Sequence, residues 1–276
     1  MRRLSPRIRG ALGSLLLLAL FLAAWQLATL PAPGARTGDP EYAALLGARR
    51  SGLPAPAQIA QAAWAQLKSP FHDGGMNDKG IAIQLAWSLG RVLLGFAIAA
   101  LVAVPLGFVV GMSPVVHRAL NPYVQLLKPI SPLAWMPLAL YTIQDSTVSS
   151  VFVISICSLW PMLLNTAHGV GSVKREWLDV ARTLEVSPAR KAFHVVLPAA
   201  APTILTGMRI SMGIAWLVIV AAEMLVGGTG IGYFVWNEWN NLSLANVIFA
   251  LLIIGLMGML LDLGFATLGK LVAYQE

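Results

Sequence analysis

Residues 176–198 read EWLDVARTLEVSPARKAFHVVLP, a charged stretch between two long apolar segments. Eight charged side chains lie within the 21 positions from Lys174 to His194, although the whole chain is 57% hydrophobic and only 11% charged. This stretch is therefore a polar connection between apolar segments, and we call residues 174–198 the hairpin.

The first half of the hairpin has the pattern of a short amphipathic helix. Its apolar residues recur at positions i, i+3, i+4 and i+7: Trp177, Val180, Ala181 and Leu184. A second short helix is predicted to begin at Ser187, because serine followed by proline is typical of a helix start, and to end before Pro198. Its apolar residues repeat the same spacing: Ala189, Ala192, Phe193 and Val196.

Both predicted helices are too short to cross a bilayer, and each presents an apolar face that needs a cover. One cover is the lipid surface or the protein's own helices, and the other is a partner protein. The residue pattern alone favours the two equally.

The composition indicates an all-α polytopic membrane protein. The mean hydropathy is +0.73, and the apolar runs are too long for the strands of a barrel. A spanning helix needs about 20 apolar residues to cross roughly 30 Å of hydrocarbon. Six spans are predicted, near residues 11–30, 85–111, 122–144, 148–170, 201–226 and 246–270. The third contains four prolines and is predicted to be bent: Pro122, Pro129, Pro132 and Pro137.

Lys and Arg near the span ends predict the orientation. Twelve lie on the side of the N-terminus and of the hairpin, against five on the other side, all on one loop. Both termini and the hairpin are therefore expected in the cytoplasm. This bias accounts for most of the net charge of +7, so no nucleic-acid partner is required.

Residues 1–84 are expected to form a first unit, with one span and an outer loop carrying a short helix at PAPAQIAQAAWAQL. A cleavable signal peptide over residues 1–30 is the alternative. Residues 85–276 would form the core of five spans and the hairpin. Within the second span, a stripe of small residues predicts a close helix contact: Gly95, Ala99, Ala103, Gly107 and Gly111.

No enzymatic site is predicted. The four histidines lie in different segments, Cys157 is the single cysteine, and no hydrolase or metalloprotease motif occurs. Residues 264–270, GFATLGK, resemble a phosphate-binding loop, but Leu271 replaces the magnesium-binding hydroxyl and the segment lies in an apolar helix. We expect no catalytic residue, metal or cofactor in the chain. The glycines of residues 227–233 predict a turn.

The hairpin resembles the cytoplasmic loop of ATP-binding-cassette (ABC) importer permeases, whose pattern is Glu-Ala-Ala, three residues, Gly, nine residues and Ile-x-Leu-Pro. Asp179, Val180 and Ala181 match its start, and Val195, Leu197 and Pro198 its end. Glu185 departs from the pattern, since it stands where the family has glycine. The resemblance implies that this loop couples to the ATPase through Trp177, Asp179, Val180, Ala181, Leu184, Glu185, Ser187, Leu197 and Pro198.

Residues 85–275 resemble permeases of the nitrate, sulfonate, taurine and bicarbonate group, most closely the nitrate type. The segments KPISPLAWMPLALYTI and GMRISMGIAWLVIVAAEMLVGG carry much of this likeness. It implies a type I, MetI-like fold in a bacterial inner membrane and a homodimer with a second copy of the chain. It also implies two further partners, cytoplasmic ATPase subunits and a periplasmic or lipid-anchored solute-binding protein.

A small anion crossing the membrane needs cations or N–H donors at membrane depth. Arg209 and Glu223 are candidates, with Trp135, Asn165 and Trp216 as further path residues. Because Arg209 and Glu223 lie fourteen residues apart, about 21 Å along a helix, each is expected to pair with another helix in a structural role. Arg91 is expected to extend outward and Asp262 to face the inner interface.

These observations together predict the permease of an ATP-driven importer of nitrate or a related small anion. Import of sulfonate, taurine or bicarbonate by the same kind of protein is the first alternative. An ATP-independent carrier or channel is the alternative from another class, and it would show inverted repeats with charge pairs in the membrane.

Overall fold

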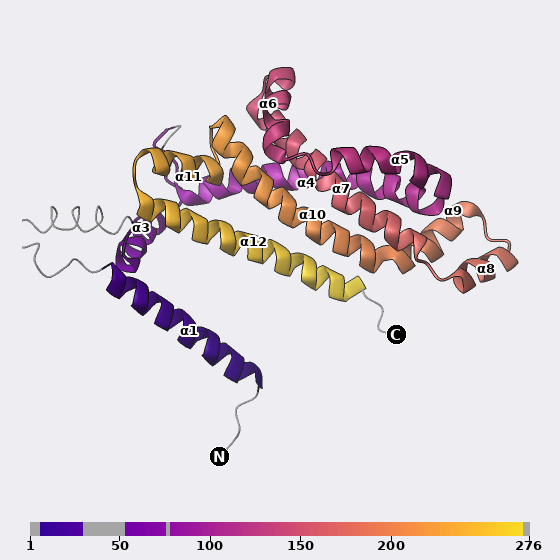
Figure 1. Cartoon of the computed structure of the whole chain (residues 1–276), viewed down its shortest axis with the longest axis horizontal. Coiled ribbons are helices and arrows are strands. Elements are labelled where there is room, and N and C mark those ends of the chain that lie inside the picture. Colours follow the sequence, from indigo (N-terminus) through magenta and orange to yellow (C-terminus); the bar gives the residue numbers. More distant parts are fainter. Residues whose placement is uncertain (1–5, 30–52, 76–77, 273–276) are drawn as a thin grey trace, which may run out of the picture.

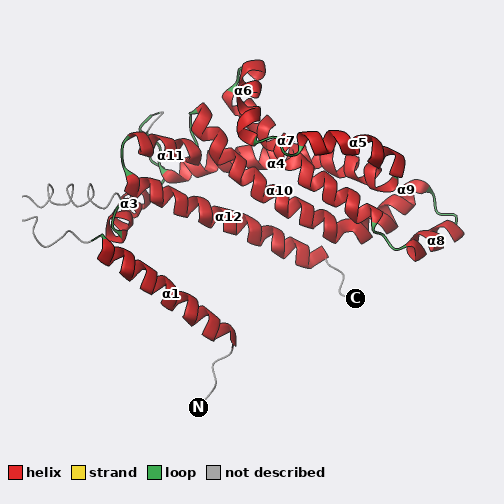
Figure 2. Cartoon of the chain, in the orientation of Figure 1, coloured by secondary structure: helices red, strands yellow, loops and turns green. Residues whose placement is uncertain are grey.

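The computed structural model describes residues 6–29, 53–75 and 78–272, and the elements in these ranges are helices (Figures 1 and 2). One isolated β-bridge joins Asp73 and Lys79. The long helices run side by side as an elongated bundle, with the hairpin at one end and α3 and α11 at the other (Figure 1). The predicted all-α class is confirmed.

Within the described residues, the first predicted span has a shorter apolar helix, Leu12–Ala28, and four other helices are long and apolar enough to cross a membrane. They are α4 (Ile81–Met112), α7 (Ser146–Gly171), α10 (Leu197–Val226) and α12 (Leu244–Val272). Each contains one of the predicted spans, at 85–111, 148–170, 201–226 and 246–270. The segment GFATLGK lies inside α12, where a phosphate-binding loop cannot form.

The predicted third span is two helices, so the expected count of six spans is not reproduced. The helix α5 (Pro114–Leu127) ends before Pro129, and α6 (Pro132–Ile143) begins after Ser131. Ser131 caps α6, since its Oγ accepts a hydrogen bond from Leu133 N–H at 3.3 Å. Proline lacks an N–H and fits the first turn of a helix, so the sequence breaks the chain here and starts it again.

The N-terminal helix α1 (Pro6–Ala28) lies apart from the long helices and meets α3 (Pro56–Lys68) near its C-terminal end (Figure 1). The helix α3 is the short helix predicted from residues 54–67, and it packs against α12 and buries Ile59. Residues 30–52 of the predicted outer loop lie outside the described residues.

The stripe of small residues on α4 packs against α7, as predicted. Ala99 and Ala103 are buried, and a Cβ on Gly107 would lie 2.7 Å from the Cβ of Thr166. A Cβ on Gly95 would lie equally close to the side chain of Ile154. Moving an apolar side chain from lipid into a helix contact gives no hydrophobic gain. Helices in a membrane therefore associate through close packing of this kind.

Candidate functional site

The hairpin begins with α8 (Arg175–Thr183), which confirms the first predicted helix. The chain then turns and enters α9 (Pro188–Lys191), followed by a single π-helical turn over Ala192–Val196. The hairpin projects from the end of the bundle that lies away from α3 and α11 (Figure 1).

The second predicted helix does not end before Pro198; it continues into α10, and one helical segment runs over Pro188–Val226. Leu197 N–H donates to the carbonyl of Ala192, five residues back. This wider turn accommodates the proline that follows, which has no N–H and whose ring crowds a regular helix. The second arm of the hairpin is therefore continuous with a membrane-spanning helix.

Glu185, which stands where the family pattern has glycine, keeps the turn geometry. Its φ is +51°, in the left-handed region, and Glu185 N–H donates to the carbonyl of Arg182 at 3.0 Å. Val186 N–H donates to the carbonyl of Ala181 at 3.1 Å. These two hydrogen bonds form a Schellman motif, which usually places glycine at this position. Glu185 therefore adopts a backbone conformation that favours glycine, within a turn that has both hydrogen bonds of the motif.

The predicted apolar face of α8 divides into a packed side and an open side. Ala181 is only 4% exposed, and Leu178 packs on a small core made by residues such as Val173 and Val196. Leu184 and Phe193 are 70% and 67% exposed. The open side also includes Trp177 and Val180. One side of the hairpin is thus held by the protein's own bundle, while the other has no cover within the described residues.

Charged side chains border this open side. Arg182 and Asp179 form an exposed ion pair at 3.2 Å, and the ammonium of Lys174 lies 5.4 Å from the ring centroid of Trp177. Ser187 and Pro198 are also exposed, whereas Leu197 is half-buried. An apolar centre with a polar rim is typical of protein–protein interfaces.

A second polar cluster lies at the other end of the bundle, around the buried carboxylate of Glu223. The side chain of Glu223 is 1% exposed and accepts hydrogen bonds from Ser88 Oγ at 2.8 and 2.9 Å. It also accepts from Arg91 Nη1 at 2.9 Å and from Gly232 N–H at 3.0 Å. Glu223 therefore joins α10 to α4, and Arg91 points to this carboxylate and not outward as expected.

This cluster also caps α11 (Ile231–Asn240). Ile231 N–H donates to Ser88 Oγ at 2.8 Å, and Gly230 N–H donates to Gln84 Oε1 at 2.6 Å. A negative charge at a helix start is favourable because the first N–H groups lack partners there. The predicted glycine turn is confirmed, since Gly227 and Gly228 have positive φ, and a Cβ on Gly230 would collide with the Glu223 carboxylate.

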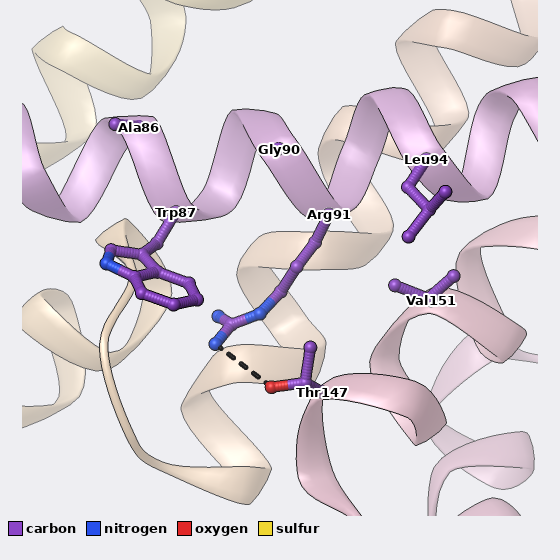
Figure 3. A pocket seen from close by; sticks show the side chains of 7 residues that line it. All are labelled: Ala86, Trp87, Gly90, Arg91, Leu94, Thr147 and Val151. Carbon is purple, nitrogen blue, oxygen red and sulfur yellow. Dashed lines mark hydrogen bonds between the residues drawn. The ribbon is translucent and has the colours of Figure 1, made fainter.

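Beside this cluster lies an open cavity of about 340 Å³ between α4 and α7. Figure 3 shows the Arg91 side chain crossing it toward Thr147, with Nη2 3.5 Å from Thr147 Oγ1. The Trp87 ring lies beside the guanidinium, 5.5 Å from ring centroid to Cζ. Arg91 Nη1 also donates to the carbonyl of Thr229 at 2.7 Å. The guanidinium thus fastens the turn before α11 to both α4 and α7.

The third group is the ion pair of Arg209 on α10 with Asp262 on α12. Arg209 Nε and Nη2 donate to the two carboxylate oxygens at 2.5 and 2.6 Å. Their side chains are 46% and 50% exposed. Arg209 and Glu223 therefore each pair with a different helix, as predicted, and Asp262 is bound to Arg209.

The remaining candidate path residues make packing contacts. Trp216 is buried and its Nε1–H donates to the carbonyl of Ile254 at 3.0 Å, which joins α10 to α12. Asn165 Nδ2 donates to the carbonyl of Pro161 in its own helix. Trp135 packs on the main core from α6. Of the five candidates, Arg209 is the one that presents an exposed charged group.

The sequence analysis missed Gln84, Ser88 and Thr147. A signal for the first two was present, because Gln84, Ser88 and Arg91 follow i, i+4, i+7 spacing in an otherwise apolar helix. Polar groups on one face of a spanning helix indicate contact with other polar groups. Thr147 has no comparable pattern around it.

Comparison with known proteins places the chain among transport components. The family model described as "Binding-protein-dependent transport system inner membrane component" matches residues 103–273. The nitrate import permease NrtB of Synechocystis sp. is 43% identical over 82% of both chains. The bicarbonate permease CmpB of the same organism is 39% identical over 97% of this chain and 88% of its own.

The taurine permease TauC of Escherichia coli is more distant, with 32% identity over 79% of this chain and 78% of its own. Among solved structures, the inward-facing methionine ABC transporter MetNI matches 70% of this chain and 96% of its own. The TM-score is 0.63 at 12% sequence identity. This likeness concerns the fold alone, and it confirms the expected MetI-like fold.

Proposed function

Because the chain belongs to the family of binding-protein-dependent transport system inner membrane components, we propose that it is the permease of an ATP-driven importer of nitrate or a related small anion. The ATP would be hydrolysed by separate cytoplasmic subunits, and an external solute-binding protein would deliver the anion. A second copy of this chain would complete the membrane unit. Both termini would lie in the cytoplasm.

The observation that carries the proposal is the open apolar side of the hairpin. Trp177, Val180, Leu184 and Phe193 leave it uncovered, and an ATPase subunit would cover it. The other side of α8 is anchored to the bundle through Leu178 and Ala181. Since the second arm continues into α10, movement of a docked ATPase would tilt a membrane-spanning helix directly.

The choice of anion rests on the relatives. Among the relatives described above, the nitrate and bicarbonate permeases are 43% and 39% identical to this chain, and the taurine permease is 32% identical. We therefore place nitrate first, bicarbonate second and sulfonates such as taurine third. Nitrate and bicarbonate are anions and taurine carries an anionic sulfonate group, so each would need a cation or N–H donors inside the membrane. Arg209 is the candidate path residue with an exposed cation.

The experiment reconstitutes the chain with its ATPase and binding protein and compares Leu184→Asp with the wild type. Interface residues of this kind contribute roughly 2 kcal/mol, so the ATPase should bind about thirtyfold more weakly. ATP-dependent uptake of labelled nitrate should fall accordingly. The matched control is Thr183→Asp, an exposed neighbour with a polar side chain, which should retain uptake.

Ala181→Asp tests the packed side of the same helix. Because Ala181 is buried against the bundle, the new charge should detach α8 and abolish coupling even though the open side is intact. Normal uptake by Leu184→Asp would contradict docking at this surface. Uptake that persists without ATP would favour an ATP-independent carrier.

A further inference from the structure

The ion pair of Arg209 and Asp262 lies near the middle of the membrane-spanning helices. Arg209 stands about 18 Å from the start of α10, which is about 45 Å long. Asp262 stands about 27 Å along the antiparallel α12, which places the two charges at the same depth. Roughly 30 Å of hydrocarbon would surround these helices. Both side chains are nonetheless about half exposed on the single chain.

Half-exposed charges at this depth do not face lipid, because charged groups inside a membrane are stable next to protein or water. The other ion pair of the span region follows this rule by burial: Glu223 is 1% and Arg91 10% exposed. The Arg209–Asp262 pair is not enclosed in this way. Its open face must therefore border water or another polar surface in the assembled protein.

The residues around Arg209 agree with a water-lined face. Thr206 and Gly213 lie three positions before and four positions after Arg209, so the three residues share one side of α10. All three are exposed, and a Cβ on Gly213 would meet no atom within 4 Å. On α12, Gly255 is equally open and lies on the side of Asp262. Small and polar residues thus lie beside Arg209 on this side of α10, and Leu217, one turn beyond Gly213, is exposed as well.

The geometry of the Arg209–Asp262 pair indicates which class of ligand Arg209 can bind. A carboxylate is planar and presents two oxygens on one edge, and the guanidinium of Arg209 holds both of them. Nitrate and bicarbonate are also planar and present the same two-oxygen edge. We propose that Arg209 binds a planar oxyanion crossing the membrane and that Asp262 occupies the same donors when the anion is absent. This inference rests on the proposed import of a small anion.

Asp262 has a defined effect in this arrangement. It competes with the anion for Arg209 and repels it once bound, so the site stays weak. A transport site needs this property, because an anion that binds too tightly does not leave. A single-atom anion such as chloride has no two-oxygen edge and cannot accept both parallel donors in the same way.

The first test measures whether water reaches the side of α10 that carries Thr206 and Arg209. Cys157 is the single cysteine of the chain, so Cys157→Ser supplies a cysteine-free background. In the full complex in proteoliposomes, Thr206→Cys should react with methanethiosulfonate ethylsulfonate at least about tenfold faster than Leu260→Cys. Leu260 is the matched control, because it is exposed near the depth of Asp262 but on the opposite side of α12. Equal rates at the two positions would overturn the inference.

The second test measures anion protection at Thr206→Cys. Sodium nitrate should slow the reaction more than sodium chloride does at equal concentration. Arg209→Lys keeps the charge but loses the planar pair of donors, and should abolish this difference. Asp262→Asn removes the competing charge, so nitrate should protect at about tenfold lower concentration. Equal protection by the two anions, or a difference that survives Arg209→Lys, would overturn the inference.

ATP-dependent nitrate uptake by the same proteoliposomes separates this inference from the proposed function. Uptake without selective protection at Thr206→Cys would overturn the anion site and leave the importer intact. Selective protection without ATP-dependent uptake would support the anion site and overturn the importer.

Discussion

Two charged residues of α10 have opposite surroundings, and the difference decides what each can do. Glu223 is enclosed by Ser88, Arg91 and the start of α11. Removing one partner of such a buried network leaves an uncompensated charge, so this cluster holds the structure in place. Arg209 is half exposed and held by a single carboxylate. Its donors can therefore be offered to another anion.

Glu185 is a residue at which the sequence departs from its family pattern at a measurable cost. Because its φ is +51°, Glu185→Gly should stabilise the turn by about 1 kcal/mol. Hydrogen exchange at the amide of Val186, which closes the turn, should slow about fivefold. The control is Glu185→Ala, which removes the charge but keeps the Cβ. An equal slowing in both variants would assign the effect to charge and contradict the strain.

At the scale of helices, the close contact of α4 with α7 depends on small residues. Ala99, Ala103 and Gly107 let the two backbones approach, and larger side chains have no space there. The hairpin works differently, because its second arm is part of a continuous helix over Pro188–Val226. The contact of α4 with α7 is therefore held by packing, whereas the second arm of the hairpin is joined to α10 by the continuous helix itself.

Gly107→Leu tests the packed interface. The added side chain would collide with Thr166 and with the carbonyl of Leu163, and overpacking of this kind costs about 1–3 kcal/mol. The temperature at which the purified protein loses its fold in detergent should fall. Gly90→Leu is the matched control on the same helix, since a Cβ there meets no atom within 4 Å. A similar loss in both variants would contradict this account of the interface.

At the scale of the whole molecule, the bundle keeps two polar regions apart. The hairpin lies at one end, and the Glu223 cluster with α11 lies at the other (Figure 1). The 39-residue helical segment that ends in α10 joins them over about 58 Å. A force applied at the hairpin would therefore reach the opposite membrane surface through one helix.

The side of the membrane on which the hairpin lies is a prediction for the whole molecule. In the Cys157→Ser background, Leu184→Cys should be labelled by a membrane-impermeant maleimide in inside-out vesicles and protected in intact cells. The reason is that positively charged loops remain in the cytoplasm, and the hairpin carries several of these charges. Labelling in intact cells would place the hairpin outside and remove the basis for ATPase docking.

The sequence alone was sufficient for the features that depend on neighbouring residues. Hydrophobic runs located four spanning helices, spacing located α8, and glycines located the turn after α10. The prolines of the third span predicted a bend, whereas the chain there forms two separate helices, α5 and α6. Helical periodicity and backbone restriction act over a few residues, so they can be read directly from the chain. The continuation of the helix through Pro198 escaped this reasoning, because a single π-turn relieves the local conflict.

Only the tertiary structure decided which polar groups meet. Arg91 and Glu223 are 132 residues apart, and Arg209 and Asp262 are 53 apart. Periodicity places each residue on a face of its own helix but carries no information about the helix opposite. The same limit applies to the hairpin, whose apolar stripe was predicted as one surface. Contact with the bundle divided it into the buried Ala181 and the open Leu184, because burial depends on what packs against a face.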